Sequence, residues 1–300
     1  MERTSIIVAR DLVKCFGSLQ AVKGISFEVE QAHCIGLLGP NGAGKTTIMR
    51  MILGLSTVSD GTLAVFGTPV GAMTRAVKAK IGLVPQESNL DPDITVSENL
   101  EVYGRYFGLS ANVIGDRVPR LLEFMQLQER AEARVTQLSG GMKRRLIIAR
   151  ALIGDPELII LDEPTTGLDP QARVLIWKQL LELKRQGKTL LLTTHYMDEA
   201  QRLCDRIIIV DQGEILEEGS PRDLIERHAL GHVFEVRKPL PAALNGHDWE
   251  HEDIGDTVLF YVRSSRKFLA ELPENADYIQ RQANLEDVFL RLTGRKLREA

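Results

Sequence analysis

The strongest constraint on the fold is one glycine-rich run, Gly39-Pro40-Asn41-Gly42-Ala43-Gly44-Lys45-Thr46-Thr47. It fits the pattern Gly, four residues, Gly-Lys-Ser/Thr, and it lies between an apolar run at 34–38 and a helical pattern at 47–53. Glycines let the backbone fold tightly around an anion, and the amides that begin the helix then point at it. The run therefore predicts a strand, a phosphate-binding loop and a helix. Lys45 is expected on the β- and γ-phosphates of a nucleoside triphosphate and Thr46 on Mg²⁺.

Composition excludes several classes of protein. The 300 residues are 44% hydrophobic and 26% charged, which is typical of a globular chain with one large or two modest domains. A net charge of −4 without a basic stripe argues against nucleic acid as a partner. No stretch approaches the roughly 20 apolar residues that cross a bilayer, and no signal peptide is evident, so we expect the chain to stay outside the membrane. Cys15, Cys34 and Cys204 have neither disulfide-framework nor metal-site spacing, and we expect reduced thiols.

A second anion-binding pattern occurs at Leu138-Ser139-Gly140-Gly141-Met142, directly before a helical pattern at 143–153. A Ser-Gly-Gly sequence at a helix N-terminus offers free amides and a hydroxyl, and the helix dipole adds to the attraction for an anion. Ser139, Gly140 and Gly141 are therefore candidate phosphate-binding residues. One triphosphate rarely needs two such sites in the same chain, so the presence of both requires an explanation.

Two adjacent carboxylates stand at the end of a predicted central strand. The apolar run 158–161 leads directly into Asp162 and Glu163. Because successive side chains diverge along a strand, Asp162 is expected to hold the Mg²⁺ shell while Glu163 acts on the attacking water as general base or orienting group. The alternative is an acidic pair at a solvated strand edge.

Two more polar residues follow apolar strand patterns. Gln86 comes shortly after residues 81–84, and His195 comes directly after residues 189–194. The amide of Gln86 suits Mg²⁺ or the attacking water, and the imidazole of His195 suits the γ-phosphate. The alternatives are a solvated loop glutamine and a helix-start histidine without a ligand.

An antiparallel flap is expected before the phosphate loop, from strand patterns at 6–12 and 25–29. Phe16 lies at the end of the first of these strands, beside Gly17. A flat ring in that position suits stacking on a purine base. The alternative is an ordinary core phenylalanine.

Strand patterns are absent from residues 87–135, which predicts an inserted helical subdomain over about 87–153. Thr95-Val96-Ser97-Glu98 reads as a capping box for one of its helices. The nucleotide-binding domain is expected to span 1–228, and a small α+β domain to span 229–300. A polar stretch in the second domain holds His247, Asp248, His251, Glu252 and Asp253, and we interpret it as a solvated loop and not a metal site.

In order and spacing, these motifs resemble an ABC-transporter nucleotide-binding subunit over residues 4 to about 225. The resemblance implies an α/β fold: a P-loop NTPase core of the ABC ATPase type, with the antiparallel β flap, the helical insertion and a small C-terminal α+β appendage. It implies ATP and Mg²⁺ as ligands. The family's roles carry over as Phe16 for adenine, Lys45 and Thr46 for phosphate and metal, Gln86 and Asp162 for Mg²⁺ and water, Glu163 as catalytic carboxylate, and His195 as switch. Met142 departs from the usual signature, which has Gln there.

A closer resemblance is to the drug- and lipooligosaccharide-export branch of this family, with its nodulation and daunorubicin-resistance types. It rests on residues 103–108, 139–145 and 284–294. It implies an ABC-2 type exporter: a polytopic membrane permease on a separate chain, and a homodimer in which Ser139 of one copy closes on ATP held by the other. The chain would then be peripheral, on the cytoplasmic side of the inner membrane.

Two other classes of protein fit the sequence less well. A soluble ABC ATPase not coupled to transport would need tandem cassettes or a long coiled coil, and neither pattern is present. A non-hydrolysing binding module would lack the carboxylate that Glu163 supplies.

Overall fold

The computed structural model describes residues 4–241, 244, 249–273 and 276–294. The chain divides into two compact units, Met1–Ile215 and Leu216–Ala300. The domain boundary that the sequence suggests, between 228 and 229, falls later in the chain and stays a prediction. No helix among the described residues has both the length and the apolarity that a membrane span requires.

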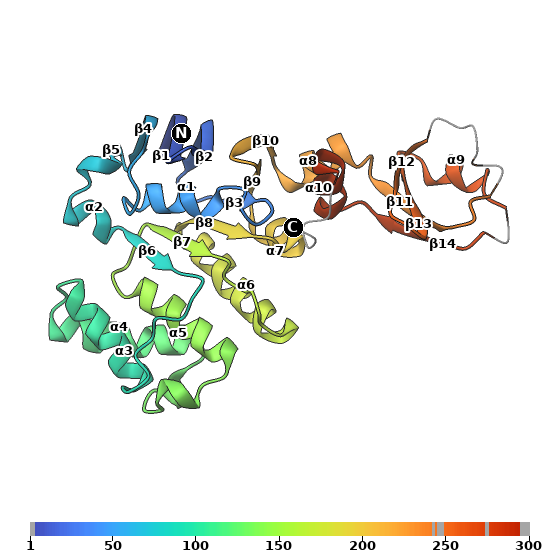
Figure 1. Ribbon diagram of the computed structural model, residues 1–300. Coiled ribbons are helices and arrows are strands. Elements are labelled where there is room, and N and C mark those ends of the chain that lie inside the picture. Colours follow the sequence, from blue (N-terminus) through green and yellow to red (C-terminus); the bar gives the residue numbers. More distant parts are fainter. Residues whose placement is uncertain (1–3, 242–243, 245–248, 274–275, 295–300) are drawn as a thin grey trace. The chain divides into compact units, whose positions relative to one another are not determined.

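A mainly parallel sheet forms the centre of the first unit (Figure 1). Its order is β10-β9-β3-β8-β7-β6, with β6, β7, β8, β3 and β9 running parallel. The predicted apolar strands are confirmed, because nearly every residue of β3, β7 and β8 is buried. The strands are β3 (Cys34–Leu38), β6 (Ile81–Val84), β7 (Leu158–Asp162), β8 (Thr189–Thr194), β9 (Arg206–Asp211) and β10 (Glu214–Gly219).

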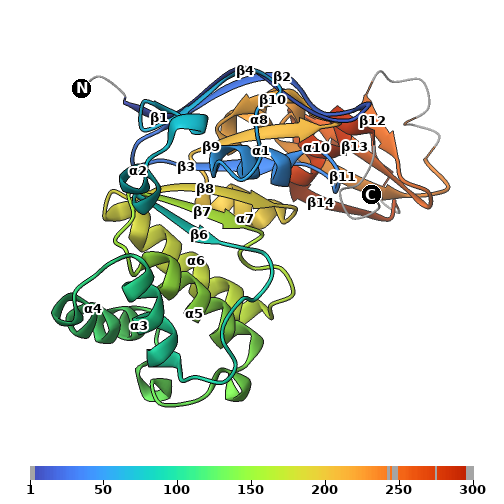
Figure 2. The same ribbon diagram turned by 60° about the vertical axis from the view of Figure 1, so that its left-hand side comes forward.

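The predicted flap is a second, antiparallel sheet of order β2-β1-β4-β5. Its strands are β1 (Ser5–Phe16), β2 (Leu19–Glu30), β4 (Asp60–Val65) and β5 (Thr68–Pro69). Helix α1 (Lys45–Ile52) lies beneath this sheet, and its apolar face shares one buried core with β1 and β3 (Figure 2). Strands β1 and β2 are both longer than predicted. In β1 the pairing register with β2 shifts between Ala9 and Leu12, which accommodates the polar pair Arg10-Asp11 and lets the strand continue to Phe16.

Helices fill the chain between β6 and β7, as predicted. The capping box at Thr95 and Glu98 is present. One of these helices contains two residues that disfavour helix formation. It begins at Ala111 despite Gly115 and Pro119, because its apolar face is buried. These helices are α3 (Val96–Tyr106), α4 (Ala111–Phe124) and α5 (Gly140–Leu152), and a short helix, α2 (Arg75–Ala79), precedes β6.

Two helices complete the α/β alternation of this unit, α6 (Pro170–Arg185) and α7 (Met197–Leu203). Strands β9 and β10 are neighbours in the sheet and form a hairpin. Its turn residues, Gln212 and Gly213, both have positive φ, at 48° and 82°, as the tight turn of a twisted hairpin requires.

The second unit is a four-stranded sheet of order β12-β13-β11-β14 with helices. Phe234, Phe260 and Phe268 form its buried core. Its elements are α8 (Pro221–His228), β11 (His232–Arg237), β12 (Glu250–Asp253), β13 (Thr257–Val262), α9 (Ser265–Leu269), β14 (Tyr278–Gln282) and α10 (Leu285–Thr293).

The solvated-loop interpretation of the polar stretch is wrong for Glu250–Asp253, which pairs with β13 as β12. Backbone pairing with an apolar neighbour outweighs the low strand propensity of acidic residues there. His247 and Asp248 lie outside the described residues. Within the described part of the chain, no cluster of three or more His, Cys, Asp or Glu side chains is arranged to hold a metal.

Close packing of β6 against α5 generates a stability prediction. A Cβ at Gly82 would lie 2.5 Å from the backbone oxygen of Ala151, which cannot move without displacing the helix. Gly82→Ala should therefore lower the free energy of unfolding by about 1–3 kcal/mol, measured by chemical denaturation. Gly115→Ala is the matched control, because nothing lies near its Cβ position and alanine favours the helix. Equal stability of both variants would contradict this packing.

Candidate functional site

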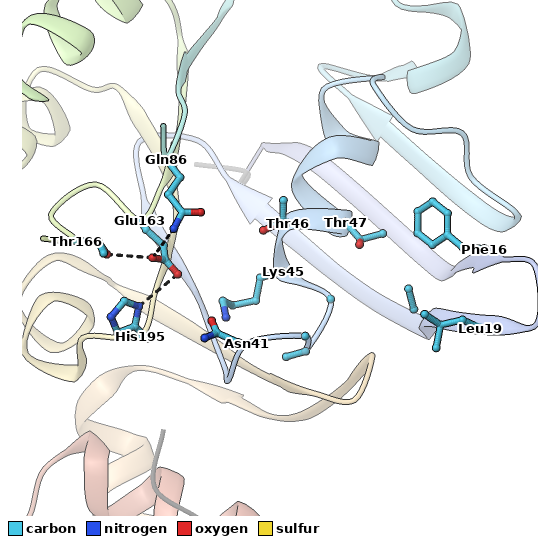
Figure 3. Close-up of a pocket in the computed structure, with 14 residues that line it drawn as sticks. Phe16, Leu19, Asn41, Lys45, Thr46, Thr47, Gln86, Glu163, Thr166 and His195 are labelled. Carbon is cyan, nitrogen blue, oxygen red and sulfur yellow. Dashed lines mark hydrogen bonds and ion pairs between the residues drawn. The ribbon is translucent and has the colours of Figure 1, made fainter. Parts of the chain in front are cut away.

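The site lies at the carboxyl edge of the parallel sheet, where the loops after β3, β7 and β8 meet. A pocket of about 540 Å³ opens there (Figure 3). Most of the residues that the sequence singled out line it, although they come from distant parts of the chain. The lining residues are Phe16, Leu19, Ala21, Asn41, Gly42, Ala43, Gly44, Lys45, Thr46, Thr47, Gln86, Glu163, Thr166 and His195.

The phosphate loop depends on glycine at the start of α1. Gly44 has φ 105°, and a Cβ there would lie 2.8 Å from the backbone oxygen of Ala21. The adjacent Lys45 is buried and donates to the backbone oxygens of Gly39 at 2.6 Å and Pro40 at 2.9 Å. Burial lowers the pKa of Lys45, while the negative charges of Glu163 and Asp162 oppose that shift. An ammonium held by neutral carbonyls in this way is ready to exchange them for phosphate oxygens.

Glu163 is the centre of a polar cluster inside the pocket (Figure 3). One carboxylate oxygen accepts from Gln86 Nε2 at 3.2 Å and Thr166 Oγ1 at 3.0 Å, and the other lies 3.3 Å from His195 Nδ1. The hydrogen bond from His195, more than any other contact, lowers the pKa of Glu163, and burial opposes it. The carboxylate is therefore ionised at neutral pH, which is the state that a general base or water-orienting group needs.

The backbone of Glu163 is held in an unusual conformation. Its φ is 46°, in the left-handed region that costs a non-glycine residue free energy. Its amide points at Thr193, whose backbone oxygen and hydroxyl lie 3.2 Å and 3.1 Å away. This turn directs the side chain of Glu163 into the pocket instead of along the strand.

Asp162 faces a neighbouring hollow of about 340 Å³, which Thr46 and Gln86 also line. The Thr193 hydroxyl donates to Asp162 Oδ1 at 2.6 Å and orients the carboxylate. Hydroxyl, amide and carboxylate oxygens are the hard ligands that suit Mg²⁺. The three residues predicted for the metal are thus brought together, and their donor set fits this ion.

Phe16 is the last residue of β1 and lies at the end of the pocket away from Glu163 (Figure 3). Its side chain is 53% exposed, so the alternative of a core phenylalanine is wrong. Leu19 lines the same end and is also exposed. Lys14 Nζ lies 4.9 Å from the centre of the Phe16 ring. An exposed ring and an aliphatic side chain at this end suit one face of a flat base.

The second anion-binding pattern is not part of this pocket. Ser139 is the N-cap of α5, where its hydroxyl accepts from the amide of Met142 at 3.3 Å. Gly140 and Gly141 form the first turn of that helix. The phosphate loop and the Ser-Gly-Gly motif of one chain therefore do not enclose the same pocket.

Sequence reasoning missed several residues that contribute to the site. Thr166 holds Glu163, and Leu19 and Ala21 line the pocket beside Phe16. Arg144, on α5, donates to backbone oxygens next to both Gln86 and Glu163. The position of Thr166 three residues after Glu163 was a usable signal, whereas nothing in the local pattern marked Arg144.

Two family models match this chain. The model described as ABC transporter matches residues 22–166, and the model of the Nodulation factor export protein NodI, C-terminal domain, matches residues 241–294. The Nod factor export ATP-binding protein I of Cupriavidus metallidurans is 50% identical over 302 residues, which cover 99% of this chain and all of that protein. The protein of the same name from Rhizobium meliloti is 49% identical and covers 99% of this chain and 90% of its own length.

Solved structures agree in fold. An ATP-binding subunit of an ABC transporter has a TM-score of 0.67 at 28% identity, covering 74% of this chain and 93% of its own. The dimeric post-hydrolysis state of the ATP-binding cassette MJ0796 bound to ADP and Pi has a TM-score of 0.65 at 28% identity, covering 71% and 98%. The predicted ABC ATPase fold is confirmed. On this evidence the chain belongs to the Nod factor export ATP-binding protein I family of ABC-transporter ATPases, which hydrolyse ATP to drive transport.

Proposed function

We propose that this chain binds Mg·ATP in the pocket, closes on a second copy of itself, and powers export of a lipooligosaccharide of the Nod factor class through a separate membrane subunit. The observation that carries the proposal is the meeting of Lys45, Glu163 and His195 in one pocket. The relatives aligned along their whole length are named for Nod factor export, which supports the cargo class and argues against an ATPase uncoupled from transport.

Each group of residues in the pocket has a separate role in ATP binding or hydrolysis. The loop amides and Lys45 bind phosphate oxygens, and the exposed ring of Phe16 stacks on adenine. Bound Mg²⁺, held by Thr46, Gln86 and Asp162, supplies positive charge that stabilises the phosphates as charge develops. Glu163 orients or deprotonates the attacking water, and His195 holds the carboxylate and contacts the γ-phosphate.

A homodimer accounts for the two anion-binding motifs. Ser139, Gly140 and Gly141 lie outside the pocket of their own chain and present free amides at the start of α5. Each motif then serves the ATP held by the partner. ABC cassettes of this fold form dimers, including one bound to the products ADP and Pi.

The membrane subunit is expected to dock beside the metal ligands. Leu53, Leu55, Leu83 and Pro85 line the same hollow as Gln86, and Leu55 is 68% exposed. Exposed apolar surface of this kind suits a protein interface. Peripheral attachment to the cytoplasmic side of the inner membrane follows from such a partner.

The helical insertion at 87–135 is a second candidate for contact with the membrane subunit, because it carries three aromatic residues of the kind enriched in interface cores. Tyr106 is 73% exposed, whereas Tyr103 is half-buried under the guanidinium of Arg150, 4.1 Å from its ring centre. Phe107 packs against Gly154. Of the three, only Tyr106 offers most of its ring to a partner.

Lys45→Ala should abolish measurable ATP hydrolysis and weaken ATP binding by about tenfold or more. Its ammonium is the nearest mobile cation to the phosphates, and a charge-assisted hydrogen bond is worth about 1.5–3 kcal/mol. Binding is measured by titration with a fluorescent ATP analogue. Lys78→Ala, on exposed α2 and outside the pocket, is the control and should bind normally. Wild-type turnover in Lys45→Ala would refute the site.

Glu163→Gln should stop hydrolysis while ATP binding continues, because the amide keeps the shape of the side chain but cannot accept a proton. Saturating ATP should then convert the monomer into a dimer by mass action, measured by light scattering. Adding Ser139→Arg should abolish that dimer, since the bulky cation fills the space meant for the partner's γ-phosphate. Persistence of a monomer in Glu163→Gln, repeated with the membrane subunit present, would argue against the two-site dimer.

Tyr106→Glu and Leu55→Glu should reduce export by about tenfold or more, while the isolated chain keeps its basal ATP hydrolysis within about twofold. A carboxylate buried at an apolar interface carries a desolvation penalty of several kcal/mol. Val174→Glu, on α6, introduces the same charge at another exposed apolar position and should leave export intact. Normal export by both test variants would place the membrane contact elsewhere.

A further inference from the structure

Arg144 is a buried cation bound to the backbone instead of to an acid. It extends from α5 and is 7% exposed. All of its hydrogen-bond acceptors are carbonyl oxygens. Nε donates to Pro164 at 2.6 Å, Nη2 donates to Asp162 at 2.8 Å and Glu163 at 2.9 Å, and Nη1 donates to Pro85 and to Gln86, the latter at 3.4 Å.

These carbonyls belong to two separate segments of the site. Pro85 and Gln86 follow β6, and Asp162, Glu163 and Pro164 end and follow β7. The planar fork of a guanidinium has five N–H donors in fixed directions, so it holds several acceptors in one geometry. One side chain therefore sets the spacing between the segment that carries Gln86 and the segment that carries Glu163.

The hydrogen bonds from Arg144 surround a residue whose backbone conformation is strained. Glu163 has φ 46°, and Arg144 binds the carbonyl oxygens before, at and after this residue. A strained backbone conformation persists only when its surroundings hold it in place. The positive charge also interacts favourably with the carboxylates of Glu199, Asp162 and Glu163. Burial lowers the pKa of Arg144 to about 10, which leaves the guanidinium charged at neutral pH.

Arg144 also links this geometry to the second anion-binding motif. Ser139 caps the same helix, and Arg144 lies one turn further along it. We propose that Arg144 is a positioning residue for ATP hydrolysis, which holds Gln86 and Glu163 in register and couples their placement to the helix that contacts the partner's ATP. This inference rests on the proposed catalytic role of Glu163.

The test compares Arg144→Lys with Arg145→Lys. Arg145 is the next residue on α5 and also donates to backbone oxygens, those of Met125 at 2.7 Å and Gln126 at 3.0 Å, but it binds no segment of the pocket. Burial lowers the pKa of Arg145 as well. The two arginines thus share a helix, a type of hydrogen bond and a test substitution. They differ in the segments of the chain whose backbone oxygens they bind.

A lysine keeps the charge but cannot reach both segments with a planar fork. Arg144→Lys should therefore lower kcat about 100-fold with KM for ATP changed less than about threefold, as expected for a small misplacement of catalytic groups. Arg145→Lys should keep kcat within about threefold. Both parameters are measured on the full chain, with the unfolding temperature followed in parallel. If Arg144→Lys does not fold, Arg144→Met, which leaves no buried charge, replaces it with the same expectation.

The positioning role would be overturned if Arg144→Lys kept the wild-type kcat. It would also be overturned if kcat fell equally in both variants and the fall followed the decrease in their unfolding temperatures. Glu163→Gln in the same assay separates this inference from the function on which it rests. Hydrolysis by Glu163→Gln at the wild-type rate would refute the catalytic site itself. An inactive Glu163→Gln beside a fully active Arg144→Lys would refute only the inference about Arg144.

Discussion

Parallel pairing of β3, β7 and β8 is the constraint on which the nucleotide site depends. Leu38 of β3 is opposite Thr194 of β8, and Asp162 of β7 is opposite Thr193. This register brings the phosphate loop, the acidic pair and His195 to one edge of the sheet, because parallel strands end on the same side. A shift of one residue in either pair would turn Asp162 or Thr193 to the other face.

Several contacts from different segments of the chain together hold Glu163 in place. Its left-handed backbone costs on the order of 1–3 kcal/mol. The hydroxyl of Thr166, the amide of Gln86 and the ring of His195 surround its carboxylate, while Thr193 accepts from its amide and Arg144 donates to its carbonyl. Together these contacts offset the strain and fix the direction of the carboxylate. They also connect Glu163 to α5, β8 and the segment after β6, so movement of any of these elements would displace its carboxylate.

The pocket around Glu163 and the apolar hollow share two residues. Thr46 and Gln86 line both, and exposed Leu55 and Leu83 lie at the second. A partner seated on the apolar hollow would therefore touch the segment that carries Gln86, whose amide donates to Glu163. Packed side chains and hydrogen bonds between two sites carry energetic coupling when they have two discrete arrangements. The architecture provides a short connection, from an apolar surface through Gln86 to the carboxylate of Glu163, the proposed catalytic group.

The sequence by itself determined the elements whose signals are local. The phosphate loop, the apolar parallel strands and the capping box at Thr95 depend on residues a few positions apart, so they were predicted with their surroundings. The tertiary structure alone decided the extent of α4, the pairing of β12, the exposure of Tyr106 and the partners of Arg144. Each of these depends on burial or on hydrogen bonds between segments distant in the chain, and no local pattern encodes which segments will meet.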